Sequence, residues 1–196
     1  YRHFTGAIVA GTGDQIINVP ARVKSMKSLF FASQRGAGNA QNRHNISQSG
    51  NMYLHEYQLK IGSVTYPPTP VRCGFSTGSI ANVAPRRAEP LMELAKAWGS
   101  VGGTKGMGQL FNQTYGQLAD PNVVQGGLCS FTPFGLDLEA FQRVAIESGV
   151  NTADRSLPIS LILNYATAPT ATNVDVFVLA DALFYINGDG SMSVSV

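Results

Sequence analysis

Apolar and polar residues alternate with a period of two over much of this chain, which is the pattern of strands with one buried face. In the segment 53–61, Tyr57, Leu59 and Ile61 share one face, and polar residues occupy the positions between them. The segment 157–166 alternates in the same way. Together, the alternating runs predict strands near residues 15–20, 28–32, 53–61, 127–132, 157–166, 173–186 and 191–196.

The segment Asn173–Ile186 differs from the other runs because it has apolar residues on both faces. Three valines alternate there with Asp175, Phe177 and Leu179. Apolar groups on both sides of a strand imply burial on both sides. We therefore expect Phe177 and Leu179 to be covered by a second layer, either an inserted helix or an adjoining roll. An Asn-Gly pair at 187–188 suits a tight turn, so the C-terminus is expected to form a closing hairpin.

One segment has the periodicity of a helix. Leu91, Leu94 and Trp98 recur on one helical face between Pro90, which suits a first helical position, and Gly99, which suits termination. An inserted helix of this kind covers an open end of a sandwich or meets a neighbouring molecule. We expect this face to pack on the core, and contact with a neighbour is the alternative.

The connections between the predicted elements are polar. Gly, Asn, Gln and Ser fill the segments 33–51 and 99–109, which are expected to be surface loops. A short helical turn is expected over Asp137–Arg143. Strands with helices only in their connections predict an all-β fold, an antiparallel jelly-roll sandwich with one or two short helices. Its length suits one domain, so residues 1–196 are expected to be a single unit.

Charge is sparse in this sequence. Charged residues make up 13% of the chain, against roughly 25% in an average soluble domain. Protein contact surfaces are depleted in charged residues, so the deficit indicates that much of the surface faces partners. Residues 1–99 contain 11 Lys and Arg but 4 Asp and Glu, whereas residues 100–196 contain 3 and 8. This asymmetry favours complementary contact patches.

Neither a nucleic-acid partner nor a membrane span is expected. The net charge of +2 is small, and the basic pair Arg86-Arg87 has no interleaved aromatic residues for stacking on bases. No apolar run approaches the roughly 20 residues of a membrane-spanning helix. The chain starts at Tyr1 and not at Met, so we expect a processed product or a fragment of a longer chain.

The sequence does not assemble a catalytic or metal-binding set of residues. Gly74–Gly78 matches the nucleophile elbow around Ser76, but that motif requires a histidine later in the chain. The histidines His3, His44 and His55 all precede it and lie too far apart to predict a metal site. We therefore expect a protein that is not an enzyme and that holds no metal or cofactor.

The two cysteines are isolated in the sequence. Cys73 and Cys129 fit no metal or redox spacing. Two such residues do not make a disulfide scaffold, so free thiols in a reducing compartment are expected.

The order and spacing of the segments resemble the second jelly roll of double jelly-roll major capsid proteins, which occur in virophages, polinton-like viruses and large nucleocytoplasmic DNA viruses. The resemblance covers about half of the chain. It rests on the stretches Asn18–Arg22 with Lys27–Phe31, Tyr57–Ser63 with Tyr66-Pro67 and Glu89–Trp98, Asp137–Glu139 with Ser148–Thr152 and Leu157–Ile159, and Ala182–Val196.

This resemblance implies a structural protein of the virion. Members of the family place two rolls side by side in each subunit, three subunits form a pseudo-hexagonal capsomer, and capsomers tile an icosahedral shell. The partners implied are further copies of the chain, neighbouring capsomers and an upstream roll of the same chain or polyprotein. A single roll departs from that pattern, which leaves a single-roll penton protein as one alternative. A carbohydrate-binding sandwich is another, although such modules normally expose aromatic residues and this chain has one Trp.

Overall fold

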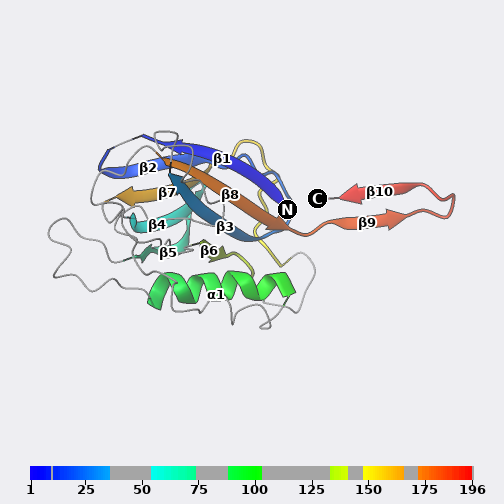
Figure 1. The fold of residues 1–196 in the computed structure, drawn as a ribbon. Helices are drawn as coiled ribbons and strands as arrows, with labels where there is room; N and C mark the ends of the chain where they lie inside the picture. Colours follow the sequence, from blue (N-terminus) through cyan, green and yellow to red (C-terminus); the bar gives the residue numbers. More distant parts are fainter. Residues whose placement is uncertain are drawn as a thin grey trace, which may run out of the picture.

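The computed structural model describes residues 1–9, 11–35, 54–73, 88–102, 133–140, 148–165 and 172–195. Within these residues, two four-stranded antiparallel sheets form a sandwich, and a two-stranded hairpin extends from it (Figure 1). The first sheet has the order β1 (Arg2–Ile8), β8 (Thr172–Ala180), β3 (Met26–Arg35) and β6 (Phe134–Asp137). The second has the order β2 (Gly13–Asn18), β7 (Ile159–Tyr165), β4 (Leu54–Ile61) and β5 (Val64–Arg72). The hairpin comprises β9 (Leu183–Ile186) and β10 (Met192–Ser195), and the helix α1 spans Ala88–Gly102.

The strands of the sandwich pair in a nested order. β1 pairs with β8, β2 with β7, β3 with β6, and β4 with β5. Pairs between β3 and β8 and between β4 and β7 join these ribbons into the two sheets. The all-β antiparallel sandwich predicted from the sequence is confirmed.

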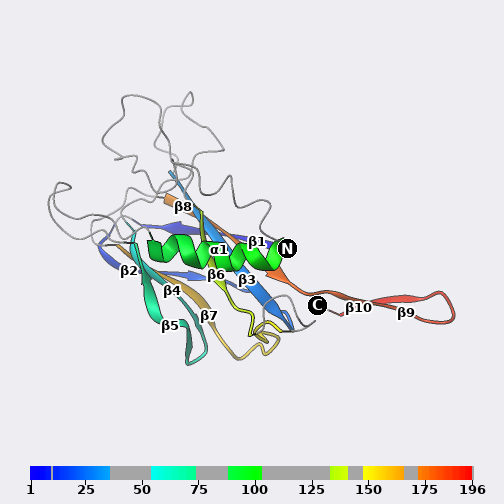
Figure 2. The ribbon, with the colours of Figure 1, turned by 90° about the horizontal axis from the view of Figure 1, so that it is seen from below.

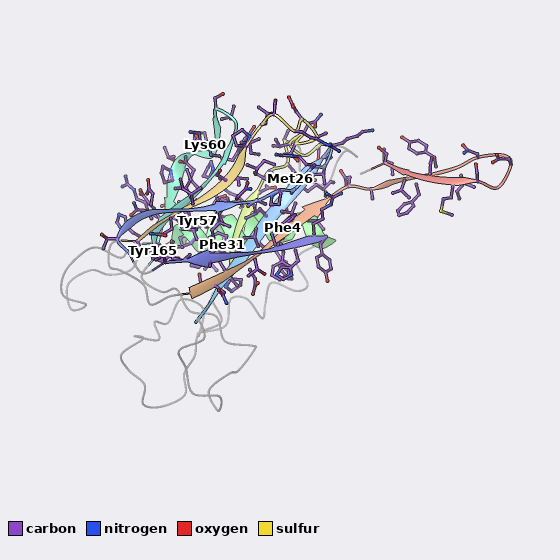
Figure 3. All side chains as sticks on the ribbon, turned by 90° about the horizontal axis from the view of Figure 1, so that it is seen from above. Phe4, Met26, Phe31, Tyr57, Lys60 and Tyr165 are labelled. Carbon is purple, nitrogen blue, oxygen red and sulfur yellow. The ribbon has the colours of Figure 1, made fainter. Side chains whose placement is uncertain are left out.

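Three aromatic rings join the two sheets in the core. Phe31 and Phe134 of the first sheet stack with their centroids 5.0 Å apart. Tyr57 of the second sheet meets Phe31 edge-on at 5.0 Å, and its hydroxyl donates to the carbonyl of Gly135. Figure 3 shows Phe31 and Tyr57 between the sheets. Edge-on and stacked rings gain attraction beyond the burial of their area, so this cluster fixes how the sheets face one another.

Most of the predicted strands are present with small shifts in their bounds. β7 has the expected alternation, with Ile159, Leu161, Leu163 and Tyr165 buried and the residues between them half-buried. In β4, Tyr57, Leu59 and Ile61 are buried on one face, as predicted for the segment 53–61. The predicted strand 127–132 lies outside the described residues.

Three strands were not predicted: β1, β5 and β6, the last of which begins after the end of the predicted strand 127–132. β1 was missed because its inward positions include Gly6, which weakens the hydrophobic signal. β5 was missed because Pro67, Pro68 and Pro70 argue against a strand, yet an edge strand tolerates proline. The Gln58 side chain donates to the carbonyls of Pro67 and Pro68 at the irregularity in the register, which satisfies backbone groups that the ladder leaves out.

The structure corrects three other expectations. The segment 173–186 is two strands, because the chain leaves the first sheet at Asp181. Helix α1 does not end at Gly99 but continues to Gly102, with Gly99 buried inside it, so packing outweighs the cost of about 1 kcal/mol for a helical glycine. The helical turn predicted over Asp137–Arg143 is wrong for the four residues that the structure describes, 137–140. Asp137 ends β6, residues 138–140 are not helical, and 141–143 lie outside the described residues.

Candidate interface surfaces

The outer face of the first sheet has a row of aromatic residues. His3, Phe30 and Phe177 lie side by side across β1, β8 and β3, in register with one another. The His3 ring stacks on Phe177 with centroids 4.6 Å apart. Tyr1 lies 6.3 Å from Phe177, and Trp98 of α1 meets Phe30 edge-on at 5.7 Å. We call these five residues the aromatic row.

Helix α1 covers one end of this face. Seen from below, it lies across β6 (Figure 2). Leu94 and Ala97 are fully buried in the contact, whereas Leu91 and Trp98 are half-buried. Of the residues on the predicted helical face, Leu94 is buried against the outer side of β6, and it does not belong to the core between the sheets. Ala97 belongs to the buried face as well, and the sequence pattern did not identify it.

Gly135 of β6 allows the helix to approach closely. A Cβ at this position would lie 3.0 Å from the Cβ of Ala97 and 3.1–3.2 Å from atoms of Leu94. The neighbouring Ser28 hydroxyl donates to the carbonyl of Ala97, which further fixes the helix on the sheet. The contact between α1 and β6 therefore requires a residue without a side chain at position 135.

We predict that Gly135→Ala lowers the free energy of unfolding by about 1–3 kcal/mol, because the added methyl group overpacks the contact with the helix. Chemical denaturation followed by circular dichroism measures the change. Gly188→Ala is the matched control, because a Cβ at Gly188 meets nothing within 4 Å. Equal stability of the Gly135→Ala variant and the unaltered chain would show that the helix is not held by this close approach.

The opposite end of the outer face is only partly covered. Asp175 of β8 accepts a hydrogen bond from the Thr5 hydroxyl at 2.9 Å, and its carboxylate lies 3.0 Å from Nε2 of His3. Phe177 and Leu179 are half-buried. The inner valines Val174, Val176 and Val178 are fully buried, as expected for one face of this strand. Coverage of Phe177 and Leu179 by a second layer beyond the chain stays a prediction.

The hairpin of β9 and β10 projects away from the sandwich (Figure 1). We call residues 183–195 the arm. Cross-strand pairs Met192–Ile186 and Val194–Phe184 alternate with the pairs Ser193–Tyr185 and Ser195–Leu183. One face of the arm therefore carries four large apolar side chains. Their exposed fractions are 66% for Phe184, 74% for Ile186, 65% for Met192 and 53% for Val194.

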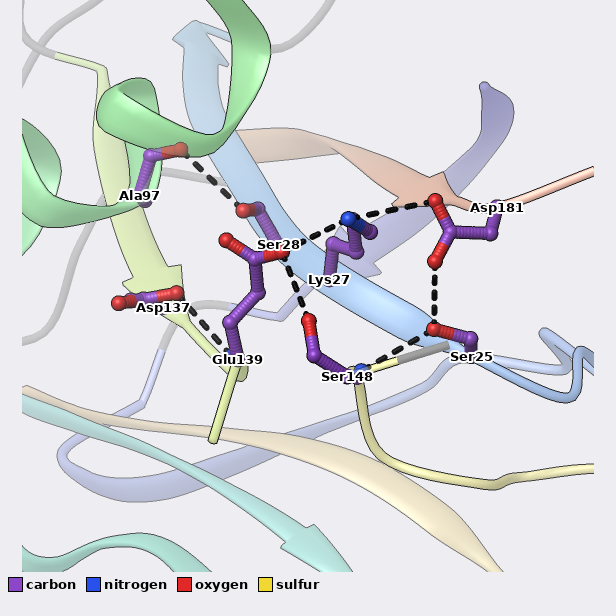
Figure 4. Close-up of polar contacts among 9 residues, drawn as sticks. Ser25, Lys27, Ser28, Ala97, Asp137, Glu139, Ser148 and Asp181 are labelled. Atoms are coloured by element: carbon purple, nitrogen blue, oxygen red, sulfur yellow. Dashed lines mark hydrogen bonds and ion pairs between the residues drawn. The ribbon is translucent and has the colours of Figure 1, made fainter. Parts of the chain in front are cut away.

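A cluster of polar side chains holds the root of the arm (Figure 4). Nζ of Lys27 lies 2.8 Å from Oε1 of Glu139 and 3.3 Å from Oδ1 of Asp181. The hydroxyl of Ser25 donates to Oδ2 of Asp181, and the Asp181 N–H donates to the Ser25 carbonyl. Ser148 donates to Glu139 at 3.0 Å. These five residues, the root cluster, tie the start of β3, the chain after β6 and the start of the arm together.

The ion pairs of the root cluster raise the pKa of Lys27, with its contact to Glu139 as the largest cause and burial opposing it. A raised lysine pKa stabilises the folded state below the unfolded pKa. The contribution is lost as the pH rises through the folded value, above about 10.5. Around neutral pH the pairing is fully present.

We predict that Lys27→Met lowers the free energy of unfolding by about 3 kcal/mol, because it leaves the Glu139 carboxylate buried without its cation. Lys96→Met is the matched control, since Lys96 pairs with Glu93 on the exposed surface of α1, where a pair contributes less than about 1 kcal/mol. Both variants are measured by urea denaturation at pH 7. If both variants lost a similar amount of unfolding free energy, the buried pair of Lys27 and Glu139 would contribute no more than an exposed one.

The other residues singled out in the sequence do not form a site in the described part of the chain. Gly74–Gly78 and His44 lie outside it, and His3 and His55 are on different sheets. Among the described residues, no group of three His, Cys, Asp or Glu side chains could hold a metal ion. Cys73 is a free thiol whose pKa is raised by burial, whereas Cys129 is not among the described residues.

The helix in the described ranges is too short and too polar to span a membrane. No protein-family model matches the chain, and no curated protein matches its sequence.

The root cluster had no usable signal in the sequence. The ion-pair partners of Lys27 are more than one hundred residues away from it, so no local pattern joins Lys27 to Glu139 or Asp181. The arm did have a signal, because Met192 and Val194 alternate with serines. That pattern predicted the hairpin correctly, but not that its apolar face would be exposed.

Proposed function

We propose that this chain is a structural capsid protein, a jelly-roll unit of a trimeric, pseudo-hexagonal capsomer in an icosahedral virion shell. The observation that carries the proposal is the nested order of the eight sandwich strands, β1-β8-β3-β6 against β2-β7-β4-β5. First-to-last nesting of this kind supports a jelly roll, and viral capsid proteins are one of the classes that use that architecture. Fold alone does not specify function, so the surfaces must also suit the role.

The surfaces suit a protein that functions in contact with copies of itself. The arm exposes four large apolar side chains and the aromatic row exposes Tyr1, and contiguous exposed apolar patches mark contact sites. The low charge content has the same explanation, because charged residues are depleted at contacts. Neighbouring capsomers and an adjoining roll of the same chain or polyprotein are the further partners in this proposal.

The oligomeric state tests the proposal directly. Size-exclusion chromatography with light scattering is expected to give three copies per particle. Five copies would instead support a single-roll penton protein. A monomer that binds glycans on an array would support a carbohydrate-binding sandwich, for which the exposed Tyr1 beside Phe177 is the favouring observation. The single tryptophan does not favour that alternative, because Trp98 packs against Phe30.

We predict that Phe177→Asp abolishes assembly, because it places a charge beside Asp175 on the outer face that the capsomer would bury. The variant is expected to remain folded as a monomer, since the residue is only half-buried within the chain. Val64→Asp is the control, because Val64 is exposed at the turn between β4 and β5 of the other sheet. Normal assembly of Phe177→Asp with unchanged stability would exclude this face from the contact.

A further inference from the structure

The apolar face of the arm has no cover among the residues that the structure describes. An isolated two-stranded hairpin is at best marginally stable in water. The four side chains of its apolar face are each more than half exposed, so the sandwich does not shield them. The opposite face is mixed, because Ser193 and Ser195 lie there beside Tyr185 and Leu183. The more apolar of the two faces is the one expected to lie on another surface.

The arm is held in its projecting direction. Asp181 at its root is bound by Ser25 and Lys27, and the Lys24 ammonium donates to the Ser195 hydroxyl at the other strand of the arm. Both strands are therefore anchored where they leave the sandwich. Figure 3 shows the arm extending away from the two sheets, with its side chains clear of them. The described parts of the sandwich therefore leave this face open to another molecule.

We infer that the arm docks on a second copy of this chain, with its apolar face on the uncovered end of that copy's aromatic row. This inference rests on the proposed function and names the contact that would join two subunits of the capsomer. The acceptor surface comprises Tyr1, His3, Phe177 and Leu179.

The acceptor offers a contiguous apolar surface. Tyr1 is 90% exposed beside Phe177, and Leu179 follows Phe177 on the same face of β8. The other exposed apolar residues of the sandwich and helix are dispersed over different elements: Val9, Ile16, Val64 and Met92. Helix α1 occupies the far end of the face, which leaves the end formed by β1 and β8 for the arm.

The dimensions of the two surfaces also match. A four-residue strand is about 14 Å long, which is the width of three neighbouring strands at about 4.8 Å spacing. The arm can therefore cross β1, β8 and β3 of another copy. Within 183–195 the only charged residue is Asp189, at the tip, so the apolar face of the arm brings no charge into the contact.

Polar substitution on the two faces of the arm tests the contact. The double variant Phe184→Thr with Ile186→Thr is expected to lose assembly, because it removes half of the apolar face. Tyr185→Thr, on the opposite face, is expected to assemble normally. Light scattering gives the number of copies, and thermal unfolding checks that both variants keep the sandwich intact.

Crosslinking between copies tests the acceptor. One preparation has Ile186→Cys, a second has Phe177→Cys with an affinity tag, and the mixture is treated with a short bis-maleimide. A crosslink between the two chains is expected, and Tyr185→Cys in place of Ile186→Cys should reduce it at least fivefold. The unaltered chain gives the background from its own cysteines.

The outcomes separate this inference from the proposed function. If the unaltered chain is a trimer and the double variant also assembles, the arm is not the contact, while the proposed function stands. If Ile186→Cys crosslinks only to itself, the assigned acceptor is wrong. A monomeric unaltered chain would count against the capsomer itself.

Discussion

The burial of one apolar face of each sheet against the other is the constraint on which the rest of the structure depends. Phe31, Tyr57 and Phe134 close the space between the sheets, and the inward residues of β4, β7 and β8 complete the core. Once the inward faces of both sheets are set, any other apolar residue of a strand lies on the outer face of its sheet. β3 and β8 have such residues in Phe30 and Phe177. The aromatic row is thus a direct consequence of how these strands pair.

The two ends of the outer face of the first sheet are covered to different extents. At β6, the missing side chain of Gly135 lets α1 approach the backbone, so Phe30 is covered by Trp98. At β1 and β8, the His3 ring stacks on Phe177 and leaves it half-buried, and the neighbouring Tyr1 is exposed. In the proposed capsomer, this end of the face is the part that another molecule would cover, because exposed apolar patches mark contact sites.

The sequence predicted the parts of the fold that local patterns encode. Alternation identified β4 and β7, and helical periodicity identified α1 through Leu94. It failed where tertiary contacts override the local signal, as for Gly99 inside the helix. The prolines of β5 argued against a strand in the sequence, although an edge strand tolerates them. Phe177 and Leu179 were correctly placed on the second face of their strand, but periodicity does not say what covers that face.

The root cluster connects the core to the arm and sets the geometry available for assembly. Lys27 brings two carboxylates from distant parts of the chain to the end of the sandwich, so the arm leaves it in a fixed direction. In the proposed contact, the arm of one copy meets a different surface on the next copy. In such a head-to-tail contact, every copy binds one neighbour through its arm and a second neighbour through its acceptor surface. It therefore either closes into a ring or continues as a filament. A fixed arm direction selects between the two, because a ring closes only if the rotation between copies is a whole fraction of a turn with no shift along the axis. The buried charge of Glu139 is costly to place inside a protein, and a rigid arm root gives a physical reason for retaining it.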